Sequence, residues 1–377
     1  MTTTTPSTTA PPSPAAGNRV RFYQVGSFAV GNRLLPEVHS LQSSRERHNS
    51  LTSGHRACQG CGEALGARYV LDAATAAAED AGGRVVTVNA TGCLEVFSSP
   101  YPESAWRLPW LHSLFGNAPA VATGVATGLK ALGREDIRVV AQGGDGGTVD
   151  IGFGCLSGMF ERGDDVLYVC YDNEAYMNTG VQRSGATPPA ARTATTQAVG
   201  EAPGNVFGQG KDVPRIAMAH EIPYVATATV ADLHDLERKV AYAMGLHGPR
   251  YIHVFVPCPL GWGTKSSHTV RIARLAVESG LFPVFEAEHG EVTGVSHIRR
   301  QVPVEDYLVL QRRYAHLFRP TRDEQTISRI QALADRNIRR YGLLNRTDLP
   351  PVLNDKATGL VSTLGARADL NDAPEED

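Results

Sequence analysis

Residues 143–147 read Gly-Gly-Asp-Gly-Gly and follow an apolar run at 137–141 that predicts a β-strand. A second apolar run, at 166–171, leads into the sequence DNEAYMNTG at 172–180. In a parallel sheet Asp145 and Asn173 would meet at one edge, where a carboxylate and an amide suit a hard cation such as Mg²⁺ that bridges a diphosphate. The glycines let the backbone approach phosphate oxygens and leave N–H donors free. A glycine-rich turn that binds nothing is the weaker alternative, because it leaves the Asn segment without a role.

Predicted helices and strands alternate between residues 63 and 257, which indicates an α/β fold with a doubly wound, mainly parallel sheet. The sequence at 229–232 is a candidate capping box for one of the helices. The long irregular segment 184–211 is expected to form a wall over the site. The helices are expected at 63–81, 118–132, 151–160, 213–220 and 229–246, and the strands at 84–89, 137–141, 166–171, 224–226 and 251–256.

The remaining segments flank one large domain, predicted at residues 54–263. Residues 1–18 lack charge and an apolar stretch, so we expect a disordered tail rather than a signal peptide. Residues 19–53 are interpreted as a docking segment. A C-terminal helical extension is expected at 264–342, with strands within 281–292 and helices at 303–317 and 323–341. The tail 343–377 is expected to be disordered or to lie on a partner.

The composition limits the possible functions. The chain has 377 residues, 42% of them hydrophobic, and a formal net charge of −3. This charge gives no indication of nucleic-acid or anionic-membrane binding. No apolar run approaches the roughly 18 residues that a membrane-spanning helix needs. Disulfides are not expected without an export signal, so we expect a cytoplasmic protein with free thiols.

Four of the six cysteines are candidates for a single site. Cys58 and Cys61 have the CxxC spacing on a glycine-rich turn, while Cys93 and Cys258 follow predicted strands. Strand ends of a parallel sheet face one crevice, so all four thiolates can converge there. A zinc ion and an iron–sulfur cluster both accept four cysteines, and the spacing does not decide between them. The other two, Cys155 and Cys170, are predicted to be small buried hydrophobic residues.

Five segments together resemble one known family. They read GHRACQGCG (54–62), TGCLE (91–95), GGDGGTVDIGF (143–153), YDNEAYMNTG (171–180) and PCPLGW (257–262). They resemble the β subunits of pyruvate:ferredoxin oxidoreductase and related 2-oxoacid oxidoreductases, which are thiamine diphosphate enzymes. The resemblance implies the thiamine diphosphate-binding fold.

The resemblance also implies a role for each matching residue. Mg²⁺ would be bound by Asp145, Asn173 and the carbonyl of Ala175, and Asn178 would lie at the diphosphate and the reacting centre as the catalytic residue. A [4Fe–4S] cluster would be bound by Cys58, Cys61, Cys93 and Cys258. The residues implied for cofactor binding are Gly144, Asp145, Gly146, Asn173, Ala175, Asn178 and Thr179.

The implied reaction is the oxidative decarboxylation of pyruvate or a related 2-oxoacid to acyl-CoA and CO₂, with electrons passed to ferredoxin. The chain has room for one α/β module, so the resemblance places the glutamate that activates the cofactor on an α subunit, beside γ and ferredoxin-like δ subunits. Three alternatives stay open. They are an aryl 2-oxoacid dehydrogenase that passes electrons to NAD through a flavin subunit, a non-redox thiamine diphosphate lyase, and a zinc-stapled structural subunit.

Overall fold

A computed structural model describes residues 20–25, 28–34, 48–99 and 104–344 of the chain. The chain divides into two units, residues 1–48 and 49–377. In the first unit, β1 (Val20–Val25) and β2 (Phe28–Leu34) form an antiparallel pair with an irregular register after Phe22. The predicted tail 1–18 and residues 345–377 lie outside the described residues. Leu343 and Leu344, the first two residues of the predicted C-terminal tail, are buried next to Ile338.

The second unit is built on an eight-stranded sheet in the order β12-β11-β9-β10-β6-β5-β3-β4. The six strands from β9 to β4 in this order pair in parallel, while β11 and β12 add antiparallel pairings at one edge. This arrangement confirms the predicted doubly wound, mainly parallel α/β fold. The strands are β3 (Arg84–Ala90), β4 (Trp110–Ser113), β5 (Ile137–Gly144), β6 (Val166–Asp172), β9 (Tyr224–Thr229), β10 (Arg250–Phe255), β11 (Phe285–Glu288) and β12 (Glu291–Val295).

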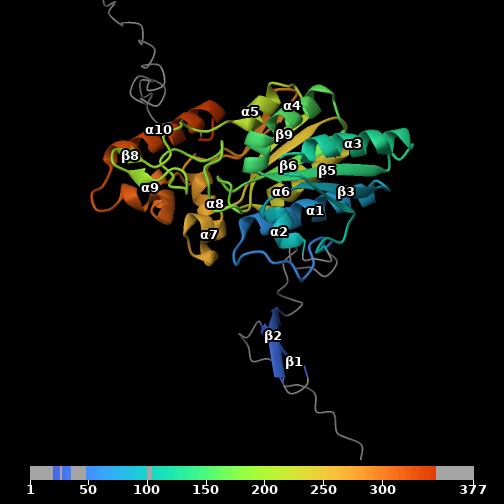
Figure 1. The fold of residues 1–377 in the computed structure, drawn as a ribbon, viewed down its shortest axis with the longest axis horizontal. Coiled ribbons are helices and arrows are strands. Elements are labelled where there is room, and N and C mark those ends of the chain that lie inside the picture. Colours follow the sequence, from blue (N-terminus) through green and yellow to red (C-terminus); the bar gives the residue numbers. More distant parts are fainter. Residues whose placement is uncertain (1–19, 26–27, 35–47, 100–103, 345–377) are drawn as a thin grey trace, which may run out of the picture. The chain divides into compact units, whose positions relative to one another are not determined.

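Helices cover both faces of this sheet (Figure 1). The central strand β6 is buried throughout, and its side chains alternate between two hydrophobic clusters, as the two-residue period of a strand requires. Tyr171 faces the cluster that includes α1 (Gly62–Asp80) and α6 (Leu233–Gly245). Cys170 faces the opposite cluster, which includes α3 (Ala118–Ala131), α4 (Phe153–Glu161) and α5 (Val213–Met218).

The chain changes direction between β3 and β5, and this opens a crevice at the carboxyl ends of the strands. After β3 the chain enters α2 (Cys93–Ser98), whose Leu94 and Phe97 pack on the α1 side. After β5 it enters a π-helical turn and then α4; Val149 of the turn and Leu156 of α4 pack on the opposite side. Ligands of doubly wound folds bind at such a switch point.

Three local predictions need correction. The helix expected at 151–160 begins at Phe153 and is preceded by a π-helical turn, Gly146–Ile151. Thr229 does not cap the helix that follows it: Thr229 ends β9, and the Asp232 carboxylate accepts from the Asp235 N–H at the start of α6.

The third correction concerns the helix expected at 303–317. The structure has two elements there, α9 (Val304–Leu308) and a 3₁₀ helix, Arg312–Leu317. The break has a local cause. The Gln311 side chain donates to the Tyr307 carbonyl at 2.7 Å, while its backbone N–H turns to the Leu308 carbonyl. The side chain thus takes the acceptor that the next α-helical bond would use.

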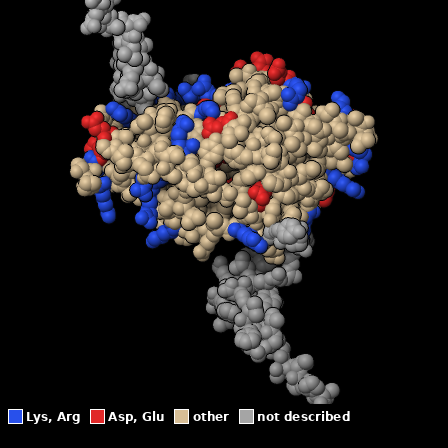
Figure 2. Space-filling view, in the orientation of Figure 1, with Lys and Arg blue, Asp and Glu red and all other residues tan. Residues whose placement is uncertain are grey.

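The C-terminal segment packs onto the domain. From this segment β11 pairs with β9, and α8 (Thr269–Glu278) and α10 (Glu324–Tyr341) contribute to the α1-side core. The short elements α7 (Pro259–Trp262), β7 (Ala198–Val199) and β8 (Ala202–Pro203) lie in the connecting loops. Among the described helices, none has both the length and the apolar character that crossing a membrane requires. Figure 2 shows that Lys and Arg on the viewed face lie mainly toward its edges.

Candidate cofactor and cysteine site

A cavity at the switch point is lined by three strand ends. Residues 91–93 follow β3, residues 144–147 lie at the end of β5 and directly after it, and Asn173 with residues 175–179 follows β6. All seven residues named above for cofactor binding line this cavity, together with Glu63 of α1. Asn178 and Thr179 are exposed, whereas Asp145 and Asn173 are buried. The structure therefore brings the predicted binding residues together, with Asp145 and Asn173, the two side chains predicted to bind a metal, at the buried end.

Asp145 and Asn173 each present an oxygen atom without a partner. The two residues are 1% and 4% exposed, and among the described residues no group hydrogen-bonds to the Oδ1 atom of either. Burial and the nearby Asp172 carboxylate raise the pKa of Asp145 well above its usual value. A buried carboxylate beside an unsatisfied amide oxygen is costly without a cation, and both oxygens are ligands that Mg²⁺ prefers. The donor set fits Mg²⁺.

Glycine at position 146 leaves room for this arrangement. A Cβ atom there would lie 2.6 Å from the Tyr176 ring. Tyr176 packs against Phe115 on the cavity wall, and its hydroxyl donates to Asp150 at 3.1 Å. A side chain at this turn would displace that aromatic wall, so packing requires glycine here.

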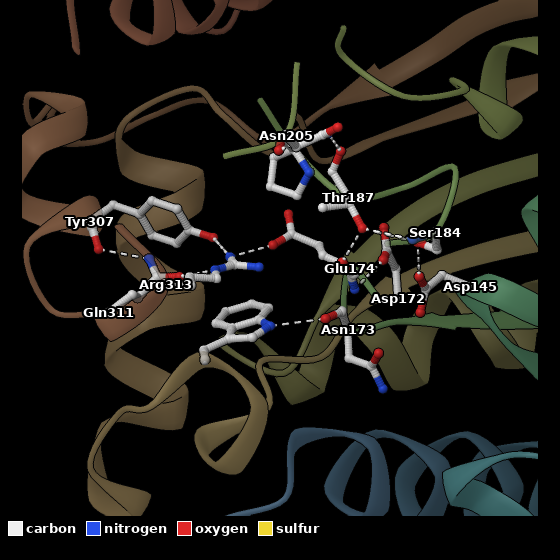
Figure 3. Close-up of polar contacts among 12 residues, drawn as sticks. Asp145, Asp172, Asn173, Glu174, Ser184, Thr187, Asn205, Tyr307, Gln311 and Arg313 are labelled. Carbon is white, nitrogen blue, oxygen red and sulfur yellow. Dashed lines mark hydrogen bonds and ion pairs between the residues drawn. The ribbon is translucent and has the colours of Figure 1, made fainter. Parts of the chain in front are cut away.

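Glu63 is a site residue that the sequence reasoning missed. It is 3% exposed in the first turn of α1, and its Oε2 accepts from the Asn173 Nδ2 at 3.1 Å. Burial raises the pKa of Glu63 to about 7. Figure 3 shows the Asn173 amide directed away from the Glu174 carboxylate. The available signal was position: Glu63 comes two residues after Cys61, at the start of a helix that faces the strand ends.

The irregular segment 184–211 reaches this site through two hydroxyl groups. Ser184 Oγ donates to Asp145 Oδ2 at 2.5 Å, and Thr187 Oγ1 donates to the Glu174 carbonyl at 2.7 Å. The Gly185 N–H also donates to Asp150 at 2.7 Å. The segment is therefore fixed to both strand ends that carry the candidate metal-binding residues, although the residues that line the cavity come from other segments, and the wall expected from the sequence stays a prediction.

Three of the four candidate cysteines lie at helix N-termini. The thiol sulfur atoms of Cys61 and Cys258 accept backbone N–H groups at the starts of α1 and α7, at 3.4 and 3.3 Å. Cys93 is the first residue of α2. Free N–H groups and the helix dipole stabilise a thiolate at such positions. Cys58 is exposed on the CxxC turn.

The four thiols influence one another and the carboxylate beside them. Burial raises the pKa of Cys93, and negative charge on Glu63 and on the other three cysteines raises it further. Burial likewise raises the pKa of Cys61 to about 12. Within the described part of the chain, no three His, Cys, Asp or Glu side chains are placed to hold a single metal ion. The other two cysteines lie elsewhere, Cys170 buried in the core and Cys155 partly buried in α4.

Comparison with known proteins identifies relatives of this chain. Residues 90–254 match the family model of the thiamine pyrophosphate enzyme, C-terminal TPP binding domain. Pyruvate synthase subunit PorB of Methanosarcina barkeri is 51% identical over 294 residues, which cover 78% of this chain and 97% of that protein. The PorB subunit of Thermotoga maritima is 40% identical over 306 residues, with coverages of 79% and 93%.

A relative with a different named substrate also matches. Ketoisovalerate oxidoreductase subunit VorB of Pyrococcus horikoshii is 42% identical over 272 residues, with coverages of 70% and 85%. Among solved structures, 2-oxoglutarate:ferredoxin oxidoreductase from Magnetococcus marinus is 27% identical, has a TM-score of 0.45, and is matched over 54% of this chain and 65% of that one. The identities and coverages of the PorB subunits confirm the resemblance found in the sequence, and the chain belongs to the β subunits of the 2-oxoacid:ferredoxin oxidoreductase family.

Proposed function

We propose that this chain binds thiamine diphosphate, Mg²⁺ and a [4Fe–4S] cluster in a CoA-acylating 2-oxoacid oxidoreductase whose preferred substrate is pyruvate. The observation that carries the proposal is the pair of buried Oδ1 atoms of Asp145 and Asn173, which have no partner among the described residues. They lie at the ends of neighbouring parallel strands, in a cavity that also contains Cys93.

When bound, thiamine diphosphate and the cluster supply the electron sink for decarboxylation and a route for single electrons. The residues of this chain hold and orient these groups. Asp145, Asn173 and the Ala175 carbonyl would bind the metal, and the N–H groups of the glycine turn would face the phosphates. Phe115 and Tyr176 form an aromatic wall on one side of the cavity. Asn178, exposed at the cavity, would contact the reacting centre.

Four cysteines beside the cofactor cavity support a metal centre. Negative charge on Cys58, Cys61 and Cys258 raises the pKa of Cys93, so these thiols lie near enough to interact. A zinc ion and a [4Fe–4S] cluster both accept four thiolates. We assign Cys58, Cys61, Cys93 and Cys258 to a [4Fe–4S] cluster, because a centre that accepts electrons beside thiamine diphosphate suits an oxidoreductase of this family.

Two features support a partner subunit at this cavity. Glu63 of α1 lines the cavity and accepts from Asn173, and the described chain contains one large α/β sheet, so we assign the acid that activates the cofactor to the second α/β module expected on an α subunit. Leu114 and Ile151 are 75% and 62% exposed, and they flank the Phe115–Gly116 turn at the cavity wall. Large apolar side chains exposed beside a cofactor cavity fit burial against a partner. We also propose that the complex contains γ and ferredoxin-like δ subunits, that it is cytoplasmic, and that ferredoxin accepts its electrons.

The test is the cofactor content of the complex, purified without oxygen through a tag on this chain. We expect thiamine diphosphate and magnesium in amounts equal to this chain, and iron with sulfide rather than zinc. A complex that contains zinc at the four cysteines, or that lacks thiamine diphosphate after purification with the cofactor present, would overturn the proposal.

A further inference from the structure

The metal-binding turn contains a residue in an unfavourable backbone conformation. Glu174 lies between Asn173 and Ala175 and has a φ of 64°, in the left-handed region that residues other than glycine rarely adopt. Its backbone is held on both sides: the N–H donates to Asp172 Oδ1 at 2.8 Å, and the carbonyl accepts from Thr187 at 2.7 Å. The shape of this turn sets where the Asn173 side chain and the Ala175 carbonyl lie. Because the backbone of Glu174 is strained, the turn needs contacts with its surroundings to keep this shape.

The side chain of Glu174 is held by an arginine from the C-terminal extension. Arg313 forms an ion pair with Glu174, and the two side chains are 4% and 13% exposed. Figure 3 shows the two side chains directed toward each other, with Tyr307 and Gln311 on the far side of the guanidinium. Arg313 Nε donates to Gln311 Oε1 at 2.8 Å, and Nη2 donates to the Tyr307 hydroxyl at 3.0 Å. The contacts with Gln311 and Tyr307 therefore orient the guanidinium toward Glu174 independently of the ion pair.

A second connection runs through Trp262, which follows the Cys258 loop. The Trp262 indole N–H donates to the Asn173 backbone carbonyl at 2.9 Å. The guanidinium of Arg313 lies 3.8 Å from the centre of a Trp262 ring, a close cation–π contact. Arg313 thus supports both Asn173 and Glu174, one through the indole and the other directly.

We propose that Arg313 is a positioning residue that keeps the turn 173–175 in the conformation that binds the cofactor metal. The inference rests on the proposed function, because it assumes that Asn173 and Ala175 bind Mg²⁺. It assigns to the C-terminal extension a role in cofactor binding, although the arginine is 139 residues away from Glu174 in the sequence. Outer partners of metal ligands typically change metal affinity by about 10- to 100-fold when they are removed.

The test compares binding with stability in the complex purified with its partner subunits. The cofactor and metal are removed by chelation, and calorimetry then gives the Kd for Mg²⁺ and thiamine diphosphate. Arg313→Lys keeps the charge but lacks the planar fork and the ring stacking, and Glu174→Gln keeps the shape but lacks the charge. We expect each to raise the Kd about tenfold or more. The unfolding midpoint of the metal-free complex should change little in Arg313→Lys.

Two further variants separate positioning from charge balance and from general stability. Arg313→Gln alone leaves a buried unpaired carboxylate and can fail to fold, whereas Glu174→Gln with Arg313→Gln removes both charges. The double variant should fold and bind weakly; normal affinity in it would overturn the inference. Arg322→Gln is the matched control, because Arg322 pairs with Glu305 in the same extension but both side chains are exposed, at 39% and 38%.

The inference and the proposed function fail in different ways. A wild-type complex that does not bind Mg²⁺ and thiamine diphosphate contradicts the proposed function. Normal binding by wild type, by Arg313→Lys and by Glu174→Gln contradicts the positioning role alone. If the Arg313 variants unfold at a lower temperature but bind Mg²⁺ and thiamine diphosphate with an unchanged Kd, the ion pair stabilises the fold and does not position the turn.

Discussion

Asn173 donates its side-chain N–H to Glu63 at 3.1 Å, and this bond fixes the amide orientation. With the nitrogen bound to Glu63, the Oδ1 atom of Asn173 is the free end of the amide, buried and without a partner among the described residues. Asp145 presents the same kind of free oxygen from the neighbouring strand. The three side chains together present the donor set proposed for Mg²⁺, with Glu63 as the residue that orients the amide.

Replacing Asp145 with Ala should remove the charged metal ligand. We expect the Kd for Mg²⁺ and thiamine diphosphate to rise by more than about a hundredfold, beyond the range typical of outer partners. The metal-free complex should not lose stability, because the buried carboxylate with its raised pKa is unfavourable there. Titration calorimetry and thermal unfolding of the metal-free complex measure the two effects. Asp136→Ala, at an exposed surface pair with Arg134, is the control. Unchanged cofactor affinity in Asp145→Ala would remove it from the site.

Replacing Glu63 with Ala should release the Asn173 amide. The amide can then rotate, and we expect the Mg²⁺ affinity to fall about 10- to 100-fold. Glu63→Gln keeps an acceptor oxygen for Asn173 and should recover much of the affinity. Calorimetry of the two variants side by side provides the measurement, and equal affinities in Glu63→Ala and wild type would show that Glu63 does not orient the amide.

Cys258 and Cys155 should respond differently to substitution. Cys258→Ser should lower the iron content by about four per chain, the number in one [4Fe–4S] cluster. Cys155→Ala should keep the iron and cost on the order of 1 kcal/mol in packing. Iron and sulfide analysis of the anaerobically purified complexes provides the measurement. Full iron in Cys258→Ser, or its loss in Cys155→Ala, would contradict the assignment of ligands.

Much of the candidate site could be predicted because its residues follow strands directly. Asp145 comes immediately after β5 and Asn173 immediately after β6, so a parallel pairing of these strands was enough to bring them together. The same reasoning placed Cys93 after β3 and Cys258 after β10. Such predictions need only the order of elements and the rule that parallel strands share one carboxyl edge.

The missed residues depend on contacts that no local pattern encodes. Glu63 meets Asn173 across 110 residues, and Arg313 meets Glu174 across 139. The break after α9 depends on the Gln311 side chain, and this break belongs to the segment that presents Arg313. At Thr229 a local pattern predicted a cap that the structure does not have. Pairing with β10 extends β9 through Thr229, and Asp232 caps the helix instead.

His316 should make stability depend on pH where the C-terminal extension meets the segment 184–211. Its Nε2 lies 2.6 Å from the Pro203 carbonyl, and burial lowers the pKa of His316 below its ordinary value of 6.5. Below pH 6.5 the unfolded chain therefore binds a proton that the folded chain does not. The stabilisation is complete above pH 6.5 and is lost as the pH falls through the folded pKa.

His316→Gln should reduce this pH dependence, because an amide can donate to Pro203 without titrating. Thermal unfolding between pH 5 and 8 is the measurement, and we expect the midpoint of the variant to fall less on acidification than that of wild type. His297→Gln, at an exposed position, is the control. An identical fall in wild type and His316→Gln would show that other groups cause the acid sensitivity.

The most direct test of the whole account is the rate at which the purified complex reduces ferredoxin with pyruvate, with and without CoA. We expect CoA-dependent reduction with formation of acetyl-CoA and CO₂, faster with pyruvate than with 2-oxoisovalerate or phenylglyoxylate, and abolished by Asp145→Ala. Decarboxylation of pyruvate without reduction of any acceptor, or without a need for CoA, would contradict the assignment of this chain to a CoA-acylating oxidoreductase.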